Sequence, residues 1–531
     1  MKAINYDKRS LGPLLALAAV MLLASVLRFS GLEIQSLRFD ELETWRYAIK
    51  SPPGILEATR VNGSDPHPPG YYLFIHYWMQ LAGDAEWALR LPSSVAGVLS
   101  VLVTFLLGRR LYSAREGLIA ALLMTVLWAP IYYSQEARAY SFLLLATALS
   151  GYFWFGIVKK LEESERVSPW ESAGYVLSAV AACYVHYIGA YLILLQGLWT
   201  VCVFVARPRL LLRPLALYGL ILLAYLPWVA SFYWRLTNVG GTLRYIDVPG
   251  WSEVPGYLKF LFNGASVEQA AIWPPNNVEP LVLAVVLALY GFLLFRGFYD
   301  SPGIREGLFR RETLLSPSFV LGLWLVVPFA GLFLLSLIWK PVLMFRVMVI
   351  ALPAAYLLIA RAIVLLPVRP VVQNGLALVG AALLLAQLLF ALDYYTEPHK
   401  EQAREVTRFL VHNGPPHSLI VYSGALGGDF VYYFERYGIR FQQEPRLELL
   451  RRRGQRPREK VALLRRKLES GDYDYVLYMR VRPIRPRVGF LKPLFRSGEL
   501  ELVKEKRFVK ADGYVFKVGK DATGRPSRDP P

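Results

Sequence analysis

An acidic pair directly after the first long apolar stretch is the part of this sequence whose residue types could do chemistry. Asp40 and Glu41 lie in the run LRFDELETWRYAIK, and the run DPHPPGYY, which contains His67, follows soon after it. Carboxylates beside a bilayer are costly, and they are usually functional when they point into a cavity. A carboxylate can also act as a general base toward a hydroxyl group. The pair therefore suggests chemistry at one face of a membrane.

Two other short polar stretches between apolar runs carry isolated cations. The stretch SQEARAY contains Glu136, Arg138 and Tyr140, and Lys340 and Arg346 lie in a later stretch. Arginine suits a phosphate group through its planar, bidentate donors, and lysine acts as a point charge. We therefore expect Arg138, Lys340 and Arg346 to bind a phosphate group.

These side chains match the needs of one reaction type, the transfer of a sugar from a lipid phosphate. The reaction needs a carboxylate base that takes the proton from an acceptor hydroxyl. It also needs cations that hold a phosphate group as this gains charge while the glycosidic bond breaks. We assign Asp40 as the base and Glu41 as the residue that positions the acceptor. His67, Glu136 and Tyr140 are candidates for positioning the substrate.

Each of these residues also has a simpler interpretation. An acidic pair after a first span is often only a solvated loop, and Glu136 and Arg138 could pair with each other. Lys340 and Arg346 could extend to the lipid headgroups, as cations at helix ends commonly do. We interpret His186, which lies in an apolar environment, as a packing or interfacial residue.

The elements that must position these residues are membrane-spanning helices. Of the 531 residues, 55% are hydrophobic and 19% are charged, and the charges are concentrated between long runs that contain none. A span needs about 20 mainly apolar residues, and the first span lacks the cleavage site of a signal peptide. We count eleven spans, within 11–27, 91–108, 117–135, 139–158, 172–206 (two spans), 214–234, 280–295, 313–339, 347–366 and 370–392.

Lysine and arginine in the short loops orient these spans. One face collects the cations of 109–115, 159–166 and 207–213, whereas the connections near 136–138 and 340–346 on the other face have few. The rich face should be cytoplasmic, in the plasma (inner) membrane. The N-terminus is then cytoplasmic, and all residues after position 393 are extracytoplasmic.

Two longer loops are expected on the outer face, at 28–90 and 235–279. The aromatic stretch 67–83 in the first loop is predicted to be an interfacial helix with Pro68 and Pro69 at its start, because a twelfth span would move the arginine clusters outside. The second loop is rich in turn residues and could be a mobile cover over an active site or a static connector. Residues 1–392 together form the predicted membrane domain.

After Asp393 the sequence changes to the pattern of a soluble domain. Alternating strand and helix patterns predict a small α/β domain over 393–520, followed by a disordered tail at 521–531. From Asp393 onward, 29 lysines and arginines face 18 aspartates and glutamates. Because nucleic acid is an implausible partner outside the cell, attraction to anionic membrane lipids fits this charge better. The alternative is an ordinary solvated surface.

The predicted elements of this domain follow from local patterns. We expect helices at 400–414, 428–438 and 459–471, the first ended by Gly414, and strands at 418–424, 473–479, 500–508 and 513–519. No Walker loop, dinucleotide glycine pattern or zinc helix signature occurs in the chain. Cys183 and Cys202 both lie inside predicted spans, where packing is the expected role.

Several of these runs resemble the membrane glycosyltransferases of the GT-C fold. RFDELETW, DPHPPGYY, ALRLPSSVAGVLSVLVTFLLGRRLY and SQEARAYSFLLL are similar to the family of dolichyl-phosphate-mannose protein mannosyltransferases and bacterial lipid A aminoarabinose transferases. WKPVLMFRVMVIALPAAYLLIA resembles the late segment of that family, although Val347 follows Arg346 where the family usually has tyrosine. The resemblance covers roughly residues 1–392.

The resemblance implies a polyprenyl-phosphate-linked sugar donor and an inverting transfer at the outer face. It also implies that Asp40 is the base and that Arg138 helps to bind the donor phosphate. The acceptor would be a lipid, a glycan or a protein. Relatives of this kind often need no metal, whereas the oligosaccharyltransferase branch does. We therefore favour no essential cofactor over a bound divalent metal.

Two other functions compete with this interpretation. A transporter or lipid flippase for envelope precursors would commonly show internal repeats and charges at the middle of the bilayer, and the sequence shows neither. A scaffold with a basic external domain would not account for charges that converge from three separate loops. The sequence thus favours an inverting glycosyltransferase.

Overall fold

The chain forms two compact units, one helical and one built around a β-sheet. The computed structural model describes residues 8–61, 67–238, 246–262, 280–299, 311–415, 417–423, 428–438, 447–448, 457–470, 473–481 and 491–519. The helical unit consists of Met1–Leu32 and Tyr47–Tyr395, and the sheet unit consists of Glu33–Arg46 and Thr396–Pro531. The sheet unit therefore combines a short N-terminal segment with the C-terminal part of the chain.

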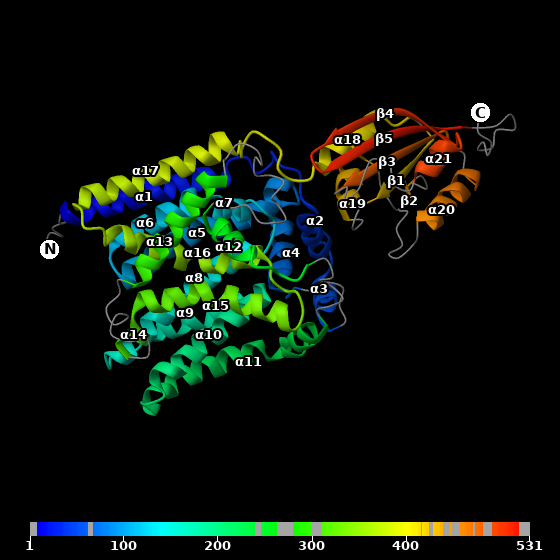
Figure 1. Ribbon diagram of the computed structural model, residues 1–531. Helices are drawn as coiled ribbons and strands as arrows, with labels where there is room; N and C mark the ends of the chain where they lie inside the picture. Colours follow the sequence, from blue (N-terminus) through cyan, green and yellow to red (C-terminus); the bar gives the residue numbers. More distant parts are fainter. Residues whose placement is uncertain are drawn as a thin grey trace, which may run out of the picture. The chain divides into compact units, whose positions relative to one another are not determined.

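The helical unit is a bundle of helices that differ widely in length (Figure 1). Its helices are α1 (Lys8–Phe29), α3 (Pro52–Thr59), α4 (Gly70–Ala82), α5 (Glu86–Leu111), α6 (Ala114–Val126), α7 (Trp128–Ser134), α8 (Tyr140–Glu162), α9 (Pro169–Val185), α10 (Tyr187–Phe204), α11 (Pro208–Asn238), α12 (Glu253–Phe262), α13 (Pro280–Tyr299), α14 (Arg311–Leu315), α15 (Pro317–Ile338), the 3₁₀ helix η4 (Phe345–Ala351), α16 (Leu352–Val364), α17 (Pro370–Ala386) and the π-helix η5 (Gln387–Ala391).

Eight of the described helical segments are long and apolar enough to cross a membrane, and the number becomes nine if α6 and α7, bent by 61°, form one broken span. The chain is thus a polytopic helical membrane protein, as predicted. The predicted count of eleven would also need α9 and α13 to cross. With 17 residues, α9 is roughly 26 Å long, slightly less than the hydrocarbon core of a typical bilayer.

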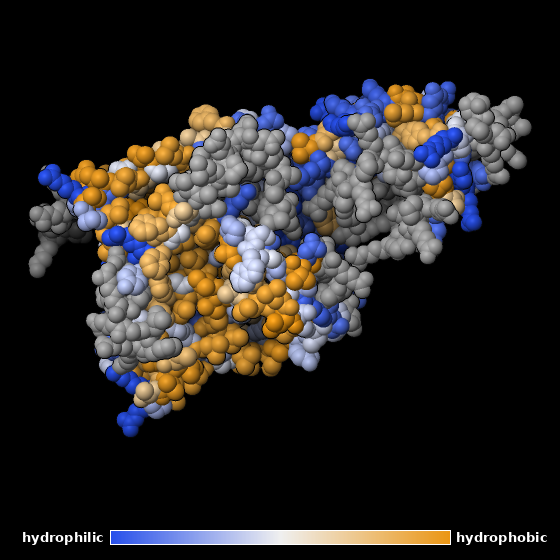
Figure 2. Space-filling view, viewed as in Figure 1, coloured by the Kyte–Doolittle hydropathy of each residue, from blue (hydrophilic) through white to orange (hydrophobic). Residues whose placement is uncertain are grey.

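The surface of the helical unit is largely apolar (Figure 2). Helices α8 and α16 are mostly buried, whereas α1 and α17 expose most of their residues. Exposed leucines such as Leu22 on α1, Leu223 on α11 and Leu383 on α17 account for much of this surface. A soluble protein would leave few such contiguous patches, so we assign this surface to contact with lipid.

Close packing in the centre of the bundle depends on small residues. A Cβ atom added to Gly108 on α5 would lie 2.6 Å from the Cα atom of Gly117 on α6. Small residues allow two spanning helices to approach each other at their backbones. Ser100 and Thr104 on α5 are buried, and their hydroxyl groups donate to the carbonyl groups four residues earlier. These two hydroxyl groups are therefore satisfied within their own helix.

The structure describes a helix in each of the two predicted outer loops, α4 in the first and α12 in the second. The stretch expected to be an interfacial helix forms α4, which begins directly after Pro69 and ends at Ala82, followed by the cap residue Gly83 with a φ of 75°. With 13 residues, α4 is too short to cross a bilayer, which takes about 20. In the second loop, α12 is a regular helix, while 239–245 and 263–279 lie outside the described residues. The idea of a mobile cover stays a prediction.

The sheet unit contains a five-stranded mixed sheet with the order β2-β1-β3-β5-β4. Strand β1 pairs in parallel with β2 and β3, and β5 pairs antiparallel with β3 and β4. The elements of the sheet unit are α2 (Phe39–Ala48), whose last two residues belong to the helical unit, α18 (Ala403–Asn413), β1 (Ser418–Ser423), α19 (Gly428–Arg436), β2 (Leu447–Glu448), α20 (Pro457–Ser470), β3 (Tyr475–Val481), α21 (Lys492–Arg496), β4 (Leu500–Phe508) and β5 (Ala511–Val518).

Helices cover both faces of this sheet. On one face, Phe409 of α18 packs so closely over Gly513 of β5 that an added Cβ atom there would lie 2.7 Å from its ring. On the other face, Leu464 of α20 joins Tyr478 and Phe516 in a buried apolar cluster. The small C-terminal mixed sheet agrees with the predicted α/β class. The short elements β2 and α21 were not predicted, and the tail 521–531 lies outside the described residues.

Candidate functional site

The acidic pair lies in the first turn of α2. The backbone N–H of Arg38, the residue before the helix, donates to Oε2 of Glu41 over 2.9 Å. This is one half of a capping box, in which the third helical residue satisfies a backbone donor at the helix start. The positive end of the helix dipole also favours carboxylates in this turn. The local sequence thus explains why a helix begins here.

The two carboxylates differ in their exposure. The side chain of Glu41 is fully buried, and its Oε2 lies 3.2 Å from Nζ of Lys400, whose side chain is 3% exposed. Asp40 is only partly buried. A second ion pair joins Arg38 to Glu401 over 3.4 Å. Of the two predicted acidic residues, Asp40 is therefore the one whose surface remains accessible.

Further contacts within the sheet unit hold the segment Glu33–Arg46. The hydroxyl group of Tyr433 on α19 accepts a hydrogen bond from the backbone N–H of Leu37 over 2.7 Å. The ring of Trp45 meets the ring of Tyr432 edge-to-face, with 5.2 Å between their centroids. The segment therefore packs as an integral part of the sheet unit, although the sequence analysis assigned it to the membrane domain.

In the helical unit, four polar side chains come together at the ends of four helices, and three of them were predicted as site residues. Arg138, 5% exposed, places Nη2 3.3 Å from Nε2 of His67. The ring of His67 lies 5.5 Å from that of His186, which in turn lies 6.3 Å from the ring of Tyr140. His67 precedes α4, Arg138 and Tyr140 lie at the start of α8, and His186 connects α9 to α10. We call these four residues and Arg346 the cationic cluster.

Electrostatics link Arg346 to this cluster. Burial, followed by the positive charges of His67, Arg138 and Arg346, holds the pKa of His186 well below its usual range. Nδ1 of His186 accepts a hydrogen bond from the N–H of Ile188 over 3.2 Å. In the neutral ring the proton is then on Nε2. His186 can therefore donate a hydrogen bond to an anion without adding a charge of its own.

The remaining predicted residues have other contacts. The carbonyl group of Glu136, which is 2% exposed, accepts a hydrogen bond from the N–H of Arg138 over 2.7 Å. Nζ of Lys340 donates to the carbonyl of Thr237, near the end of α11, over 2.8 Å. The structure thus brings His67, Arg138 and Tyr140 together with His186 and places Arg346 within electrostatic range of His186. It occupies Lys340 in a contact with α11.

Two residues of interest were not predicted. His186 was interpreted as a packing residue, and a histidine between two apolar helices gives no stronger indication in sequence. Lys400 was one of many cations in the soluble domain, and nothing local to it indicates a partner in the N-terminal segment. Both become recognisable only through contacts between distant parts of the chain.

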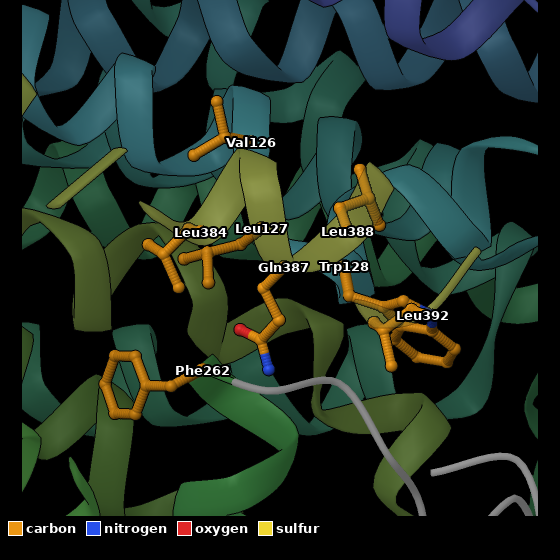
Figure 3. A pocket seen from close by; sticks show the side chains of 8 residues that line it. All are labelled: Val126, Leu127, Trp128, Phe262, Leu384, Gln387, Leu388 and Leu392. Carbon is orange, nitrogen blue, oxygen red and sulfur yellow. The ribbon is translucent and has the colours of Figure 1, made fainter. Parts of the chain in front are cut away.

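A small pocket lies at the break between α6 and α7 (Figure 3). Leu127 and Trp128 at this break, Phe262 at the end of α12, and Leu388 of η5 line it, and the amide group of Gln387 points into it. The lining is mostly apolar. Within the described residues, no group of three or more His, Cys, Asp or Glu side chains is arranged to hold a metal ion.

Comparison with known proteins agrees with the resemblance noted in the sequence. Residues 66–234 match the family model described as dolichyl-phosphate-mannose-protein mannosyltransferase. The matched segment contains His67, Arg138, Tyr140 and His186, which are four of the five residues of the cationic cluster. The chain has no significant match among curated protein sequences.

Solved structures share the fold across most of the chain. The archaeal oligosaccharyltransferase AglB from Archaeoglobus fulgidus, in complex with an inhibitory peptide and a dolichol-phosphate, is 13% identical with a TM-score of 0.53, covering 95% of this chain and 74% of AglB. ArnT from Cupriavidus metallidurans bound to undecaprenyl phosphate is 14% identical with a TM-score of 0.50, covering 94% and 97%. Its apo state is 13% identical with a TM-score of 0.51, covering 96% and 98%. At these identities the likeness concerns the GT-C fold.

Proposed function

We propose that this chain, whose residues 66–234 match the dolichyl-phosphate-mannose-protein mannosyltransferases, is an inverting glycosyltransferase of the plasma membrane. It moves a sugar from a polyprenyl-phosphate donor to an acceptor hydroxyl at the outer face. The observation that carries this proposal is the cationic cluster. Two arginines and a neutral histidine donor gather at helix ends.

The proposed reaction assigns a separate task to each group. Asp40 takes the proton from the acceptor hydroxyl, and the acceptor oxygen forms a bond to the anomeric carbon of the sugar. The bond between that carbon and the phosphate oxygen breaks, and its electron pair stays on the phosphate. Arg138 and Arg346 stabilise the added negative charge, and His186 donates a hydrogen bond to it. Attack opposite to the leaving phosphate inverts the configuration at the anomeric carbon.

The exposure of the acidic residues supports the choice of base. A general base must come within hydrogen-bonding distance of the proton that it removes. Asp40 is partly exposed, while Glu41 is fully buried beside Lys400. The relatives also support the class of donor. AglB was solved with a dolichol-phosphate and ArnT with undecaprenyl phosphate, and both ligands are lipid phosphates of the proposed kind.

The test compares envelope lipids and glycans by mass spectrometry in cells with the protein, without it, and with Asp40→Asn. We expect one glycosylated product to disappear without the protein and with Asp40→Asn. Glu33→Gln removes an exposed carboxylate from the same segment and should leave the product unchanged. A normal product level with Asp40→Asn would remove Asp40 from the role of base. Movement of the lipid donor across the bilayer without any new glycosidic bond would instead support a flippase.

A further inference from the structure

We infer that Lys400 is a positioning residue for the proposed base. The ammonium group of Lys400 holds the buried carboxylate of Glu41 and thereby fixes the first turn of α2 and the orientation of Asp40. This inference rests on the proposed function, and it gives the C-terminal sheet unit a part in catalysis. Lys400 itself touches no substrate in this scheme.

Two contacts hold the carboxylate of Glu41. Its Oε2 accepts the backbone N–H of Arg38 over 2.9 Å and lies 3.2 Å from Nζ of Lys400. Both side chains of this ion pair are almost fully removed from solvent. Removing one partner of a buried ion pair leaves an uncompensated charge, which strongly destabilises the local structure. Without Lys400, the carboxylate of Glu41 must move toward solvent and release the N–H of Arg38.

Helix geometry couples the direction of the Asp40 side chain to that of Glu41. With 3.6 residues per turn, neighbouring side chains point about 100° apart around the axis. Because Glu41 points into the sheet unit, Asp40 is directed to the side, where it is partly exposed. A rotation of this turn that carries Glu41 toward solvent therefore also turns Asp40 away. The position of the base depends on an ion pair that it does not itself form.

The rest of the segment Glu33–Arg46 has contacts that do not involve Lys400. Leu37 is held by the hydroxyl group of Tyr433, and Trp45 is held by the ring of Tyr432. Loss of Lys400 should thus loosen the first turn of α2 without releasing the whole segment or unfolding the sheet unit. This predicts a local effect that can be separated from a loss of the fold.

The experiment measures hydrogen exchange by mass spectrometry on the full chain in lipid nanodiscs. Lys400→Met keeps the apolar stem and removes the charge. We expect amide exchange in residues 38–42 to become on the order of a hundredfold faster. We also expect the glycosylated product in cells to fall at least tenfold, while the affinity of the protein for undecaprenyl phosphate stays within about twofold. This pattern separates loss of the base from loss of donor binding.

A compensating variant keeps the inference testable if Lys400→Met folds poorly. In Lys400→Met with Glu41→Gln, no charge is buried and the amide oxygen can still accept the N–H of Arg38, and such neutral replacements are often tolerated. We expect slow exchange in residues 38–42 to return in this double variant. Exchange that stays as fast as in Lys400→Met alone would overturn the inference, because the unpaired charge of Glu41 would then not be what loosens the turn. Normal exchange and product in Lys400→Met alone would also overturn it.

A matched control removes a different ion pair from the same unit. Arg465 on α20 pairs with the buried side chain of Glu499 over 2.5 Å. Arg465→Met should lower the melting temperature of the sheet unit but leave exchange in residues 38–42 and the product unchanged. If Asp40→Asn proves active, the proposed base is wrong. Exchange in Lys400→Met still decides independently whether Lys400 holds this turn.

Discussion

Replacement of Arg138 by alanine is the most direct test of the cationic cluster. The change removes a guanidinium group that is 5% exposed and that places Nη2 3.3 Å from His67. It leaves the backbone contacts of the residue in place, because the N–H of Arg138 donates to the carbonyl of Glu136 and its own carbonyl accepts from Ser93. The start of α8 should therefore keep its conformation.

The expected loss follows from the type of contact that disappears. A hydrogen bond to a charged group contributes about 1.5–3 kcal/mol. At about 1.4 kcal/mol for each factor of ten, Arg138→Ala should weaken the binding of a lipid phosphate roughly 10- to 150-fold. Arg138→Lys keeps the charge but loses the bidentate geometry. Its affinity should lie between those of the wild type and the alanine variant.

The assay is calorimetric titration of undecaprenyl phosphate into the purified chain in nanodiscs. Arg235→Ala is the matched control, because Arg235 is also a buried arginine of the helical unit and its Nη2 donates to the carbonyl of Arg60 over 3.3 Å. We expect the control to bind with normal affinity. If Arg138→Ala binds as tightly as the wild type, the cluster is not the donor-phosphate site. An equal loss in both variants would show that any buried cation of this unit matters, which also refutes the specific role.

Three further predictions concern pH, packing and topology. The pKa of His186 is lowered in the folded state, so the unfolded chain binds the proton first as the pH falls below about 6.5, and the folded state loses stability there. His186→Gln should flatten the decrease in melting temperature between about pH 6.5 and 5, and an unchanged decrease would assign it to other groups. Gly108→Ala would place a Cβ atom 2.6 Å from a backbone carbon of α6 and should lower the free energy of unfolding by about 1–3 kcal/mol, whereas Gly219→Ala, with nothing within 4 Å among the described atoms, should not. A cysteine at the exposed position of Lys50, in a cysteine-free background, should react with an impermeant thiol reagent from outside intact cells, and reaction only after permeabilisation would reverse the proposed orientation.

Local patterns in the sequence predict most of the helices and strands. The helix α18 ends at Asn413, before the predicted terminator Gly414, and α4 starts at Gly70, directly after the two prolines that were predicted to open it. Cap residues and apolar periods act over a few residues, so they can be recognised without the fold. The number of spans is harder, because α9 has 17 residues and its role depends on the neighbours that it packs against.

The candidate site is only partly predictable for a related reason. Asp40 and Arg138 are proposed from residue type and setting, but the buried ion pair of Glu41 involves Lys400, 359 positions away in the chain. No pattern within the acidic segment indicates this partner. His186 likewise becomes notable through the ring of His67, which a different loop contributes. Contacts of this kind arise from tertiary structure and have no local pattern.

The distance along the chain between Glu41 and Lys400 also sets an order of events during synthesis. The ribosome must add 359 residues after the glutamate before the lysine exists, which takes roughly 20 to 70 s at about 5–20 residues per second. The bundle helices up to α17 can enter the membrane in this interval, while Lys400, the partner of Glu41 on α2, has not yet been synthesised. The proposed base is consequently among the last features to be assembled, and we expect a chain that stops before its C-terminal sheet to be inserted but inert.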